Sequence, residues 1–172
     1  RMLLESVEGG AARGRYSVIA LLPDLVWKCR NGEVTLDGTL LQGKPLDTLK
    51  DIIDQSQMDL PVDMPPMIGG VFGVLGYDMV RQMEVLPNAP VNDLDLPEGI
   101  MIRPQLFAVF DSVRDELTLA VPVRGAMTTA EAHALLDRAR AALAAPLEDA
   151  TETLRAGTEL APPASNVTQE QF

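Results

Sequence analysis

A β-hairpin is predicted by the sequence LVWKCRNGEVTL at residues 25–36. Trp27 and Cys29 are separated and followed by charged residues, so one face of the first strand is apolar and the other is polar. Asn31 and Gly32 then supply the two residues that adopt positive φ in a type I′ turn, and the alternation continues on the return strand. This hairpin indicates an antiparallel sheet, from which the remaining elements are placed.

Further strands flank the hairpin, and residues 2–41 are predicted to be mainly β structure. The apolar run at residues 17–22 predicts a strand that ends at Pro23. The glycine-rich run at residues 68–77 predicts a buried strand with close backbone neighbours. Two more strands are predicted at residues 106–110 and 117–123, joined through residues 111–116.

Two helices are predicted where apolar residues recur every three or four positions, at residues 45–56 and 129–145. Their expected buried stripes are Leu46, Leu49, Ile52 and Ile53 in the first helix and Ala132, Leu135, Leu136, Ala139 and Leu143 in the second. The proline-containing segments 60–67 and 86–99 predict a connector and an irregular loop. Strands interrupted by isolated helices predict an α+β fold, with a mainly antiparallel sheet and a few flanking helices.

The composition excludes several classes of function. The chain has 172 residues, of which 47% are hydrophobic and 23% charged, which is typical of one globular domain with a real core. Its 14 basic and 25 acidic residues give a net charge of −11, so we expect no nucleic-acid partner and no membrane partner. One cysteine and one histidine leave little room for a disulfide framework, a zinc cluster or a Ser-His-Asp triad.

Three features that suggest chemistry have simpler structural explanations. His133 is predicted to lie on a solvated helix face, with Asp137 at i+4. Cys29 shares its strand face with Trp27 and is best explained as a small core residue. The glycines at residues 69–76 lack the GxxxxGK[ST] pattern of a phosphate-binding loop, so close packing explains them better. The carboxylates are scattered along the chain, so no metal site is predicted.

A more informative combination of side chains occurs near the N-terminus. Glu5 and Ser6 end one predicted strand, and Arg15 and Tyr16 begin the next one after a glycine-containing loop. Facing strands would place a carboxylate, a hydroxyl, a guanidinium and an aromatic ring beside Leu4. Such a set suits a small zwitterion with an apolar side chain. These residue types are also common at strand ends, so the residues alone leave both explanations open.

Four segments of the chain, taken together, resemble anthranilate synthase component I of the chorismate-utilising enzymes. They occur in the family's order and cover essentially the whole chain. The segments are LLESVEGG at 3–10 with GRYS at 14–17, GGVFGVLGYD at 69–78, Arg103-Pro104 with VFDSV at 109–113, and SNVT at 165–168.

The resemblance implies a parent enzyme that converts chorismate and glutamine-derived ammonia to anthranilate and pyruvate in tryptophan biosynthesis. It implies a glutamine amidotransferase component II as partner and Mg²⁺ as cofactor. In the family, the magnesium ligands and the acid/base groups lie in the C-terminal chorismate-binding region. We therefore assign no catalytic residue and no metal ligand to this chain, which we expect to be inactive alone.

The resemblance also implies part of a feedback site for L-tryptophan. Leu4, Glu5 and Ser6 match the family's first motif, and Gly14, Arg15 and Tyr16 match its second strand. Ser6 is expected to hydrogen-bond the amino-acid moiety, with Leu4 and Tyr16 lining the indole. Arg15 and Glu5 have an alternative role, since either residue can form a structural ion pair instead.

The domain organisation follows from the same comparison. We expect residues 1–145 to form the N-terminal regulatory domain, 146–164 a linker, and 165–172 the truncated start of the chorismate-binding domain. A helix-start pattern at 165–172 predicts that a longer chain continues there. No secretory signal precedes the first strand, so a cytoplasmic location is expected. The alternatives are aminodeoxychorismate synthase component I of the folate branch, or a stand-alone amino-acid-binding module.

Overall fold

The computed structural model describes residues 1–5, 14–89, 91–146, 164–165, 167–168 and 170. Within these ranges it contains a seven-stranded sheet in which every pair of neighbours is antiparallel. The strands are β1 (Met2–Leu4), β2 (Tyr16–Arg30), β3 (Glu33–Leu36), β4 (Thr39–Leu41), β5 (Phe72–Leu75), β6 (Gly99–Asp111) and β7 (Glu116–Ala120). The helices are α1 (Pro45–Ser56), the 3-10 helix η1 (Tyr77–Gln82) and α2 (Thr129–Ala144). The predicted α+β class is confirmed.

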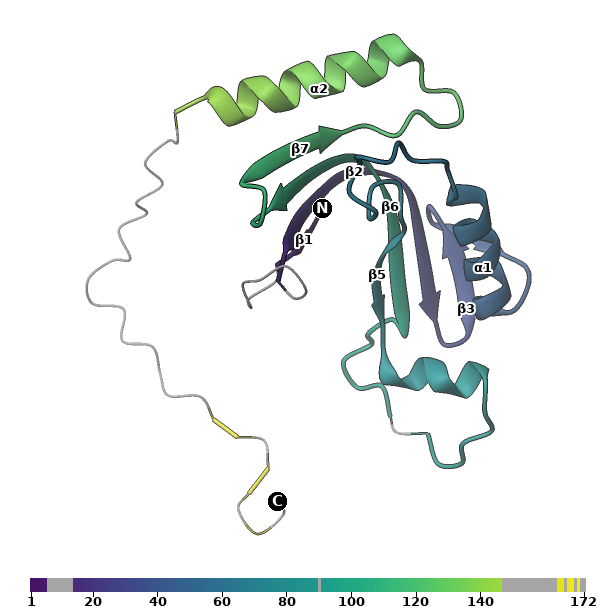
Figure 1. The fold of residues 1–172 in the computed structure, drawn as a ribbon. Coiled ribbons are helices and arrows are strands. Elements are labelled where there is room, and N and C mark those ends of the chain that lie inside the picture. The colour runs from purple at the N-terminus through teal and green to yellow at the C-terminus, as the bar shows by residue number, and fades with distance from the viewer. Residues whose placement is uncertain (6–13, 90, 147–163, 166, 169, 171–172) are drawn as a thin grey trace.

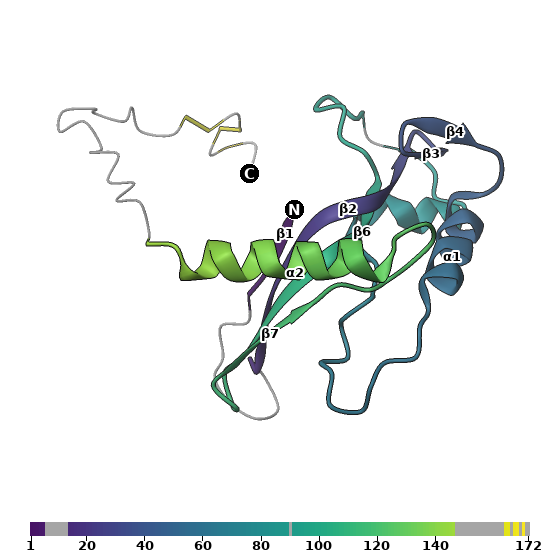
Figure 2. The ribbon, with the colours of Figure 1, turned by 90° about the horizontal axis from the view of Figure 1, so that it is seen from above.

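The strand order is β4-β3-β2-β6-β5, with β1 beside β2 and β7 beside β6. The two long strands β2 and β6 form the spine of the curved sheet seen in Figure 1. Helix α1 lies at the end of the sheet near β3, and α2 crosses the other end over β7 (Figures 1 and 2). The hairpin predicted at residues 25–36 is confirmed, with Asn31 and Gly32 both at positive φ.

The strand predicted to end at Pro23 does not end there, because β2 continues to Arg30. The pairing of β2 with β6 shifts by one residue between Pro23 and Leu25, which marks a β-bulge. Pro23 lies opposite Pro104, so the two residues that lack an N–H group face each other where the ladder is irregular. Before the shift the buried residues of β2 are even-numbered, such as Ala20, and after it they are odd-numbered, such as Trp27.

The glycine-rich run was predicted to be a buried strand, and this prediction is wrong. β5 is an edge strand, and three of its four residues are exposed. The close backbone neighbour does exist, but within the sheet: a Cβ atom added to Gly73 would lie 1.9 Å from the carbonyl oxygen of Ile100 on β6. The glycine therefore permits strand pairing, and burial is not required to explain it.

Both predicted helices form, but their buried faces differ from the predicted stripes. In α1, Leu49 and Ile52 are buried, whereas Ile53 is 45% exposed. Thr48 and Ser56 are also buried. Their hydroxyls can leave water because they donate to the backbone carbonyls of residues 45 and 52, at 2.8 and 2.6 Å.

Helix α2 has only one buried residue, Ala132, and Leu143 is 54% exposed. The rest of its predicted stripe, Leu135, Leu136 and Ala139, is half-buried. Helix α2 thus lies over the sheet without packing closely against it, so its apolar face is only partly buried.

Other boundaries were predicted approximately. β6 is longer than the predicted strand at residues 106–110, and β7 ends three residues before the predicted position 123. The helix η1 was not predicted. Residues 147–163, most of the expected linker, lie outside the described residues, as do 166, 169, 171 and 172 at the expected helix start. The domain boundaries therefore stay predictions.

Candidate functional site

The two N-terminal motifs lie on neighbouring strands, as predicted. Leu4 on β1 is opposite Val18 on β2, and Tyr16 lies two residues before Val18 on the same face of the strand. Leu4 is 47% exposed. Glu5 follows β1, is exposed, and makes no ion pair with any other described residue. Ser6 lies outside the described residues.

Arg15 makes a bidentate ion pair with Asp111, the last residue of β6. The guanidinium Nε lies 2.9 Å from Oδ1 and Nη2 lies 2.7 Å from Oδ2 of the carboxylate. The backbone N–H groups of Val113 and Arg114 also donate to Oδ1, at 3.1 and 3.2 Å. The hydrogen bond from Arg15, aided by those N–H groups, lowers the pKa of Asp111 from 3.8 to about 2. Asp111 is therefore ionised at neutral pH.

Further hydrogen bonds, made by Ser112, fix the start of β2. The backbone N–H of Ser112 donates to the carbonyl oxygen of Arg15 at 2.9 Å, and its hydroxyl donates to the carbonyl of Gly14 at 3.3 Å. Gly14 has φ of +75°, a conformation that favours glycine. The Cζ atom of Arg15 lies 4.8 Å from the centroid of the Tyr16 ring, which is a cation–π contact. Arg15 thus links the carboxylate to the aromatic ring.

A pocket of about 330 Å³ opens beside this ion pair. Arg15, Tyr16 and Asp111 line it, together with the connector residues 62–66, which are apolar except for Asp63. Arg114, Glu116 and Thr118 also line the pocket, and Glu116 is paired with Asp111 on the neighbouring strand. Charged groups next to an aromatic ring suit a small ligand with a polar and an apolar end.

The pocket gathers only part of the predicted site. Arg15 and Tyr16 line it, but Leu4 and Glu5 do not. Asp111 and Arg114 are site residues that sequence reasoning missed. An aspartate at a strand end, followed by residues whose N–H groups need acceptors, is the signal that was available. Asp111 on β6 pairs with Tyr16 on β2, which is far away in the sequence. A pattern of neighbouring residues cannot predict such a contact.

The remaining candidates carry little chemistry. His133 is exposed on α2. Cys29 is fully buried, and its burial, followed by the charge of Glu98, raises the pKa of the thiol from 9.0 to about 11. Among the described residues, no three His, Cys, Asp or Glu side chains are grouped so that they could hold a metal ion. No helix in that part of the chain is long and apolar enough to cross a membrane.

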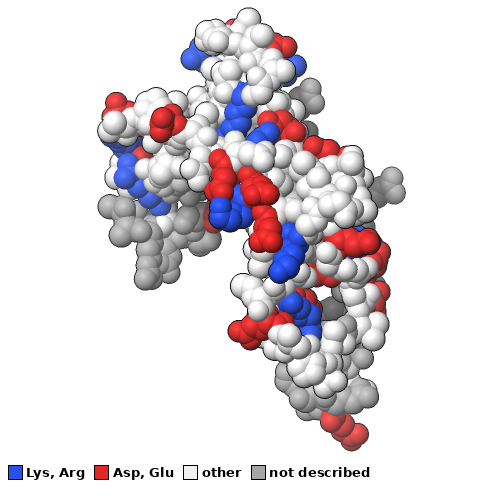
Figure 3. Space-filling view, turned by 90° about the vertical axis from the view of Figure 1, so that its right-hand side faces the viewer, with Lys and Arg blue, Asp and Glu red and all other residues white. Residues whose placement is uncertain are grey.

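Charged groups of both signs are interspersed on the face of the molecule that Figure 3 shows. In that view no continuous basic surface of the kind that binds a phosphate backbone is present.

No protein-family model matches the chain. Anthranilate synthase component 1 of Cereibacter sphaeroides is 43% identical over 129 residues, which are 70% of this chain and 26% of the relative. The Thermus thermophilus protein of the same name is 34% identical over 71% of this chain and 26% of its own length. The Synechocystis protein is 38% identical over 67% of this chain and 24% of its own length. The chain thus spans about a quarter of the length of these relatives.

A solved structure has the same fold. The crystal structure of anthranilate synthase component I from Streptococcus pneumoniae TIGR4 superposes with a TM-score of 0.69. The match covers 85% of this chain and 32% of the other, at 22% identity. By sequence and by fold, this chain is a homologue of the N-terminal region of anthranilate synthase component 1.

Proposed function

We propose that this chain is the N-terminal, regulatory part of an anthranilate synthase component I. The observation that carries the proposal is the 43% identity over 129 residues with the Cereibacter sphaeroides protein of that name. In this proposal the whole enzyme is a lyase that converts chorismate and ammonia to anthranilate and pyruvate in tryptophan biosynthesis. A glutamine amidotransferase component II supplies the ammonia, and we place the enzyme in the cytoplasm.

The catalytic groups lie outside this chain in our proposal. Its single histidine is exposed, and its single cysteine is a buried thiol with a raised pKa, which makes a poor nucleophile. The described residues do not fit Mg²⁺, which prefers several carboxylate and water oxygens around one point. We therefore place the Mg²⁺ ligands outside the described residues, and the chain alone is expected to be inactive.

The proposed role of the chain is to hold part of the tryptophan feedback site. Leu4, Glu5 and Ser6 come from the first motif and Gly14, Arg15 and Tyr16 from the second. The pairing of β1 with β2, and the shared face of Leu4 and Tyr16, support this assignment. Leu4 and Tyr16 line the indole, and Ser6 hydrogen-bonds the amino-acid moiety.

The ion pair with Asp111 supports a structural role for Arg15 in our proposal. Its guanidinium already binds a carboxylate bidentately, so we assign it to positioning the Tyr16 ring. Glu5 makes no ion pair with another described residue, and in our proposal its carboxylate accepts a hydrogen bond from the ammonium group of the inhibitor. Inhibition is then a coupling between two sites, in which bound tryptophan favours a domain arrangement that binds chorismate poorly.

The test uses the whole enzyme that carries this sequence, supplied with chorismate, Mg²⁺ and ammonium, with anthranilate fluorescence as the readout. We expect anthranilate formation that tryptophan suppresses. Ser6→Phe should raise the inhibitory tryptophan concentration by about tenfold or more, because a clash of about 1.4 kcal/mol already changes affinity tenfold. Leu3→Phe is the matched control, since Leu3 is 61% exposed on the opposite face of β1 from Leu4.

Each other outcome would contradict a different part of the proposal. Unchanged inhibition in Ser6→Phe would contradict the assigned site while leaving the enzyme assignment intact. Formation of aminodeoxychorismate in place of anthranilate would move the protein to the folate branch. Absence of any reaction, with tryptophan still bound, would indicate an amino-acid-binding module without an enzyme.

A further inference from the structure

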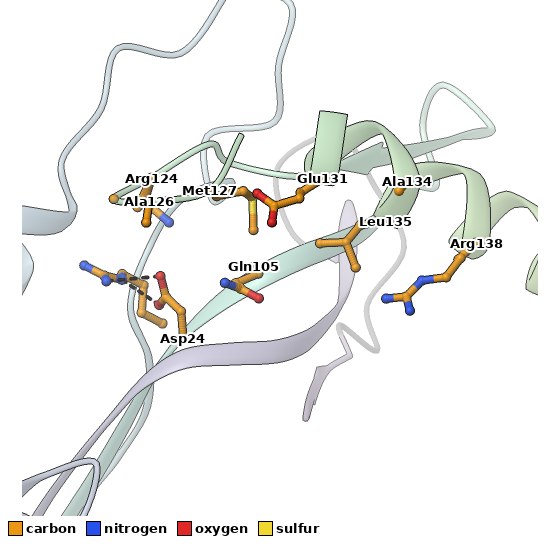
Figure 4. A pocket seen from close by; sticks show the side chains of 11 residues that line it. Asp24, Gln105, Arg124, Ala126, Met127, Glu131, Ala134, Leu135 and Arg138 are labelled. Atoms are coloured by element: carbon orange, nitrogen blue, oxygen red, sulfur yellow. Dashed lines mark hydrogen bonds and ion pairs between the residues drawn. The ribbon is translucent and has the colours of Figure 1, made fainter. Parts of the chain in front are cut away.

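A second pocket, of about 660 Å³, lies between the sheet and the first half of α2. Its floor is the region of the β-bulge, where Asp24 of β2 meets Arg103 and Gln105 of β6. Its roof is formed by residues 124–127 and the start of α2. In Figure 4, Asp24 and Gln105 project from the sheet toward the side chains of α2. The volume is within the range of small-molecule sites.

The pocket is lined by three guanidinium groups and two carboxylates, and both carboxylates are already bound. Asp24 accepts two hydrogen bonds from Arg103, at 2.8 and 3.1 Å. Glu131 accepts from the backbone N–H and the hydroxyl of Thr128, at 2.7 and 2.8 Å, and these bonds lower the pKa of Glu131. Asp24 is thus paired with Arg103, whereas Glu131 keeps its negative charge beside the other two arginines.

Arg124 and Arg138 are those two arginines. The Nη2 atom of Arg124 donates to the backbone carbonyls of Ser56, at 3.1 Å, and Gly69, so this cation is bound by neutral groups. Burial, followed by the charge of Arg103, lowers the pKa of Arg124. Arg138 makes no hydrogen bond or ion pair with the described residues and points toward the pocket in Figure 4. The pocket thus carries three cations and two anions, and this excess of one positive charge, in a protein of net charge −11, favours an anionic ligand.

An apolar pocket of about 350 Å³ continues from this one beneath the second half of α2. The two pockets share Leu135 and Arg138, which shows that they adjoin. Apart from Arg138, the second pocket is lined entirely by apolar side chains. They are Ile19, Leu21 and Leu22 of β2, Leu106 and Ala108 of β6, Leu119 of β7, and Leu135, Ala139, Ala142 and Leu143 of α2.

We propose that the groove under α2 binds a small amphiphilic carboxylate, whose head lies between Arg124 and Arg138 and whose apolar body lies against Leu119 and Leu135. The cationic end alone would accept any small anion, and the apolar end alone would accept any small apolar molecule. Because Arg138 lines both pockets, one ligand can contact both, and it then needs an anionic head and an apolar body. The planar fork of an arginine matches a carboxylate bidentately, which favours this head group.

Octanoate, kept well below its micelle-forming concentration, is the probe. Its affinity for the chain is measured by calorimetry and compared with those of octanol, octylammonium and acetate. We expect octanoate to bind at least about tenfold more tightly than octanol or octylammonium, because among these three molecules only octanoate carries a negative charge to balance the excess positive charge of the pocket. Acetate should also be at least about tenfold weaker, because each buried CH₂ contributes to affinity.

Two variants assign the binding to this groove. Arg138→Gln should lower the affinity for octanoate by about fivefold and leave the affinity for octanol unchanged. The expected loss is modest because an exposed guanidinium contributes less to binding than a buried one. Arg140→Gln is the matched control, because Arg140 is on the same helix, is 73% exposed and does not line either pocket. Leu135→Ala should weaken octanoate more than acetate.

Three results would overturn the proposal. They are equal affinities for octanoate and octanol, equal effects of the substitutions at positions 138 and 140, and no octanoate binding at millimolar concentration. Tryptophan should not displace octanoate, because the groove does not include the residues of the proposed feedback site. Competition between the two ligands would likewise contradict a separate site.

Discussion

The two long helices of this chain pack against one sheet in opposite ways. Helix α1 has no side-chain cap at its N-terminus, but five of its residues are buried. Helix α2 has a complete capping box between Thr128 and Glu131, but only Ala132 is buried. Tertiary packing therefore holds α1, whereas local interactions hold α2.

The composition of the helices explains this difference. Leu49 and Ile52 of α1 fill a core that includes Trp27, whose indole N–H donates to the hydroxyl of Thr48 at 3.0 Å. Helix α2 is rich in alanine, which favours helix formation but has too little volume to fill the space above the sheet. A helix that forms without closing on its sheet leaves a groove. In this chain that groove is where we place a ligand.

The largest expected effect on stability comes from removing Trp27, at the end of the sheet that α1 packs against (the closed end); the end under α2 is the open end. Trp27→Ala should lower the free energy of unfolding by about 3–5 kcal/mol, because the side chain is fully buried and its removal leaves a cavity. Leu135→Ala, the counterpart at the open end, should cost about 1 kcal/mol. Trp27 is the single tryptophan, so urea unfolding is followed by circular dichroism. Similar losses in the two variants would contradict the distinction between the helices.

A backbone contact at the closed end should give the next largest effect. An alanine at position 73 meets the carbonyl of Ile100, so Gly73→Ala should cost about 2–3 kcal/mol by separating β5 from β6. Gly125→Ala at the open end meets no atom within 4 Å, but its φ is +54°. Its cost should be about 1 kcal/mol, from the left-handed conformation alone. Thermal unfolding of both variants measures the two costs, and a reversed order would refute the close approach at Gly73.

The sequence predicted the features that depend on neighbouring residues better than those that depend on residues distant in the chain. The turn at Asn31 and Gly32 and the extents of both helices follow from neighbouring residues, and the sequence predicted them correctly. The continuation of β2 through Pro23 depends on Pro104, which is distant in the chain. The exposure of β5 likewise depends on its place at the sheet edge, which no local pattern contains.

The candidate site shows the same division. Arg15 and Tyr16 could be selected from the sequence because they follow one another beside a glycine. Their partner Asp111 is 96 residues away from Arg15, so the ion pair emerges only from the pairing of β2 with β6. The groove under α2 could not be predicted either, because the periodic stripe of α2 indicates a buried helix. Periodicity predicts which face turns inward, and it contains no information on how closely that face packs.

A smaller effect should come from the cap of α2. Thr128→Ala removes the acceptor for the backbone N–H of Glu131 and should cost about 1 kcal/mol. If α2 is held mainly by its cap, the loss should appear as faster amide hydrogen exchange in its first turns, with α1 unchanged. Thr129→Ala, one residue further on, keeps the cap and should leave exchange unchanged or slightly slower. Uniform acceleration throughout the chain would indicate that α2 is part of the common core.

The smallest effect expected is a pH dependence of stability at Asp111, where β2 begins and β6 ends. Because the pKa of Asp111 is lowered from 3.8 to about 2, the unfolded chain binds a proton more readily than the folded chain between these values. The stabilisation is therefore complete above about pH 4 and is lost as the pH falls through about 2. Asp111→Asn keeps an oxygen for the N–H groups of Val113 and Arg114 but removes the charge. Its stability should fall less steeply than that of the unmodified chain across this range.

Urea unfolding at a series of pH values from 5 to 2 measures this difference, and the matched control separates it from the chain's general acid sensitivity. On α2, the Oδ1 atom of Asp137 lies 4.0 Å from the Nη1 atom of Arg140, and both side chains are about three-quarters exposed. Asp137→Asn should follow the unmodified chain at every pH, because such an exposed pair contributes little. If the Asp111 and Asp137 variants have the same pH profile, the bidentate contact with Arg15 does not stabilise the start of β2. The positioning role given to Arg15 would then have to be abandoned, and its guanidinium would become available to a ligand.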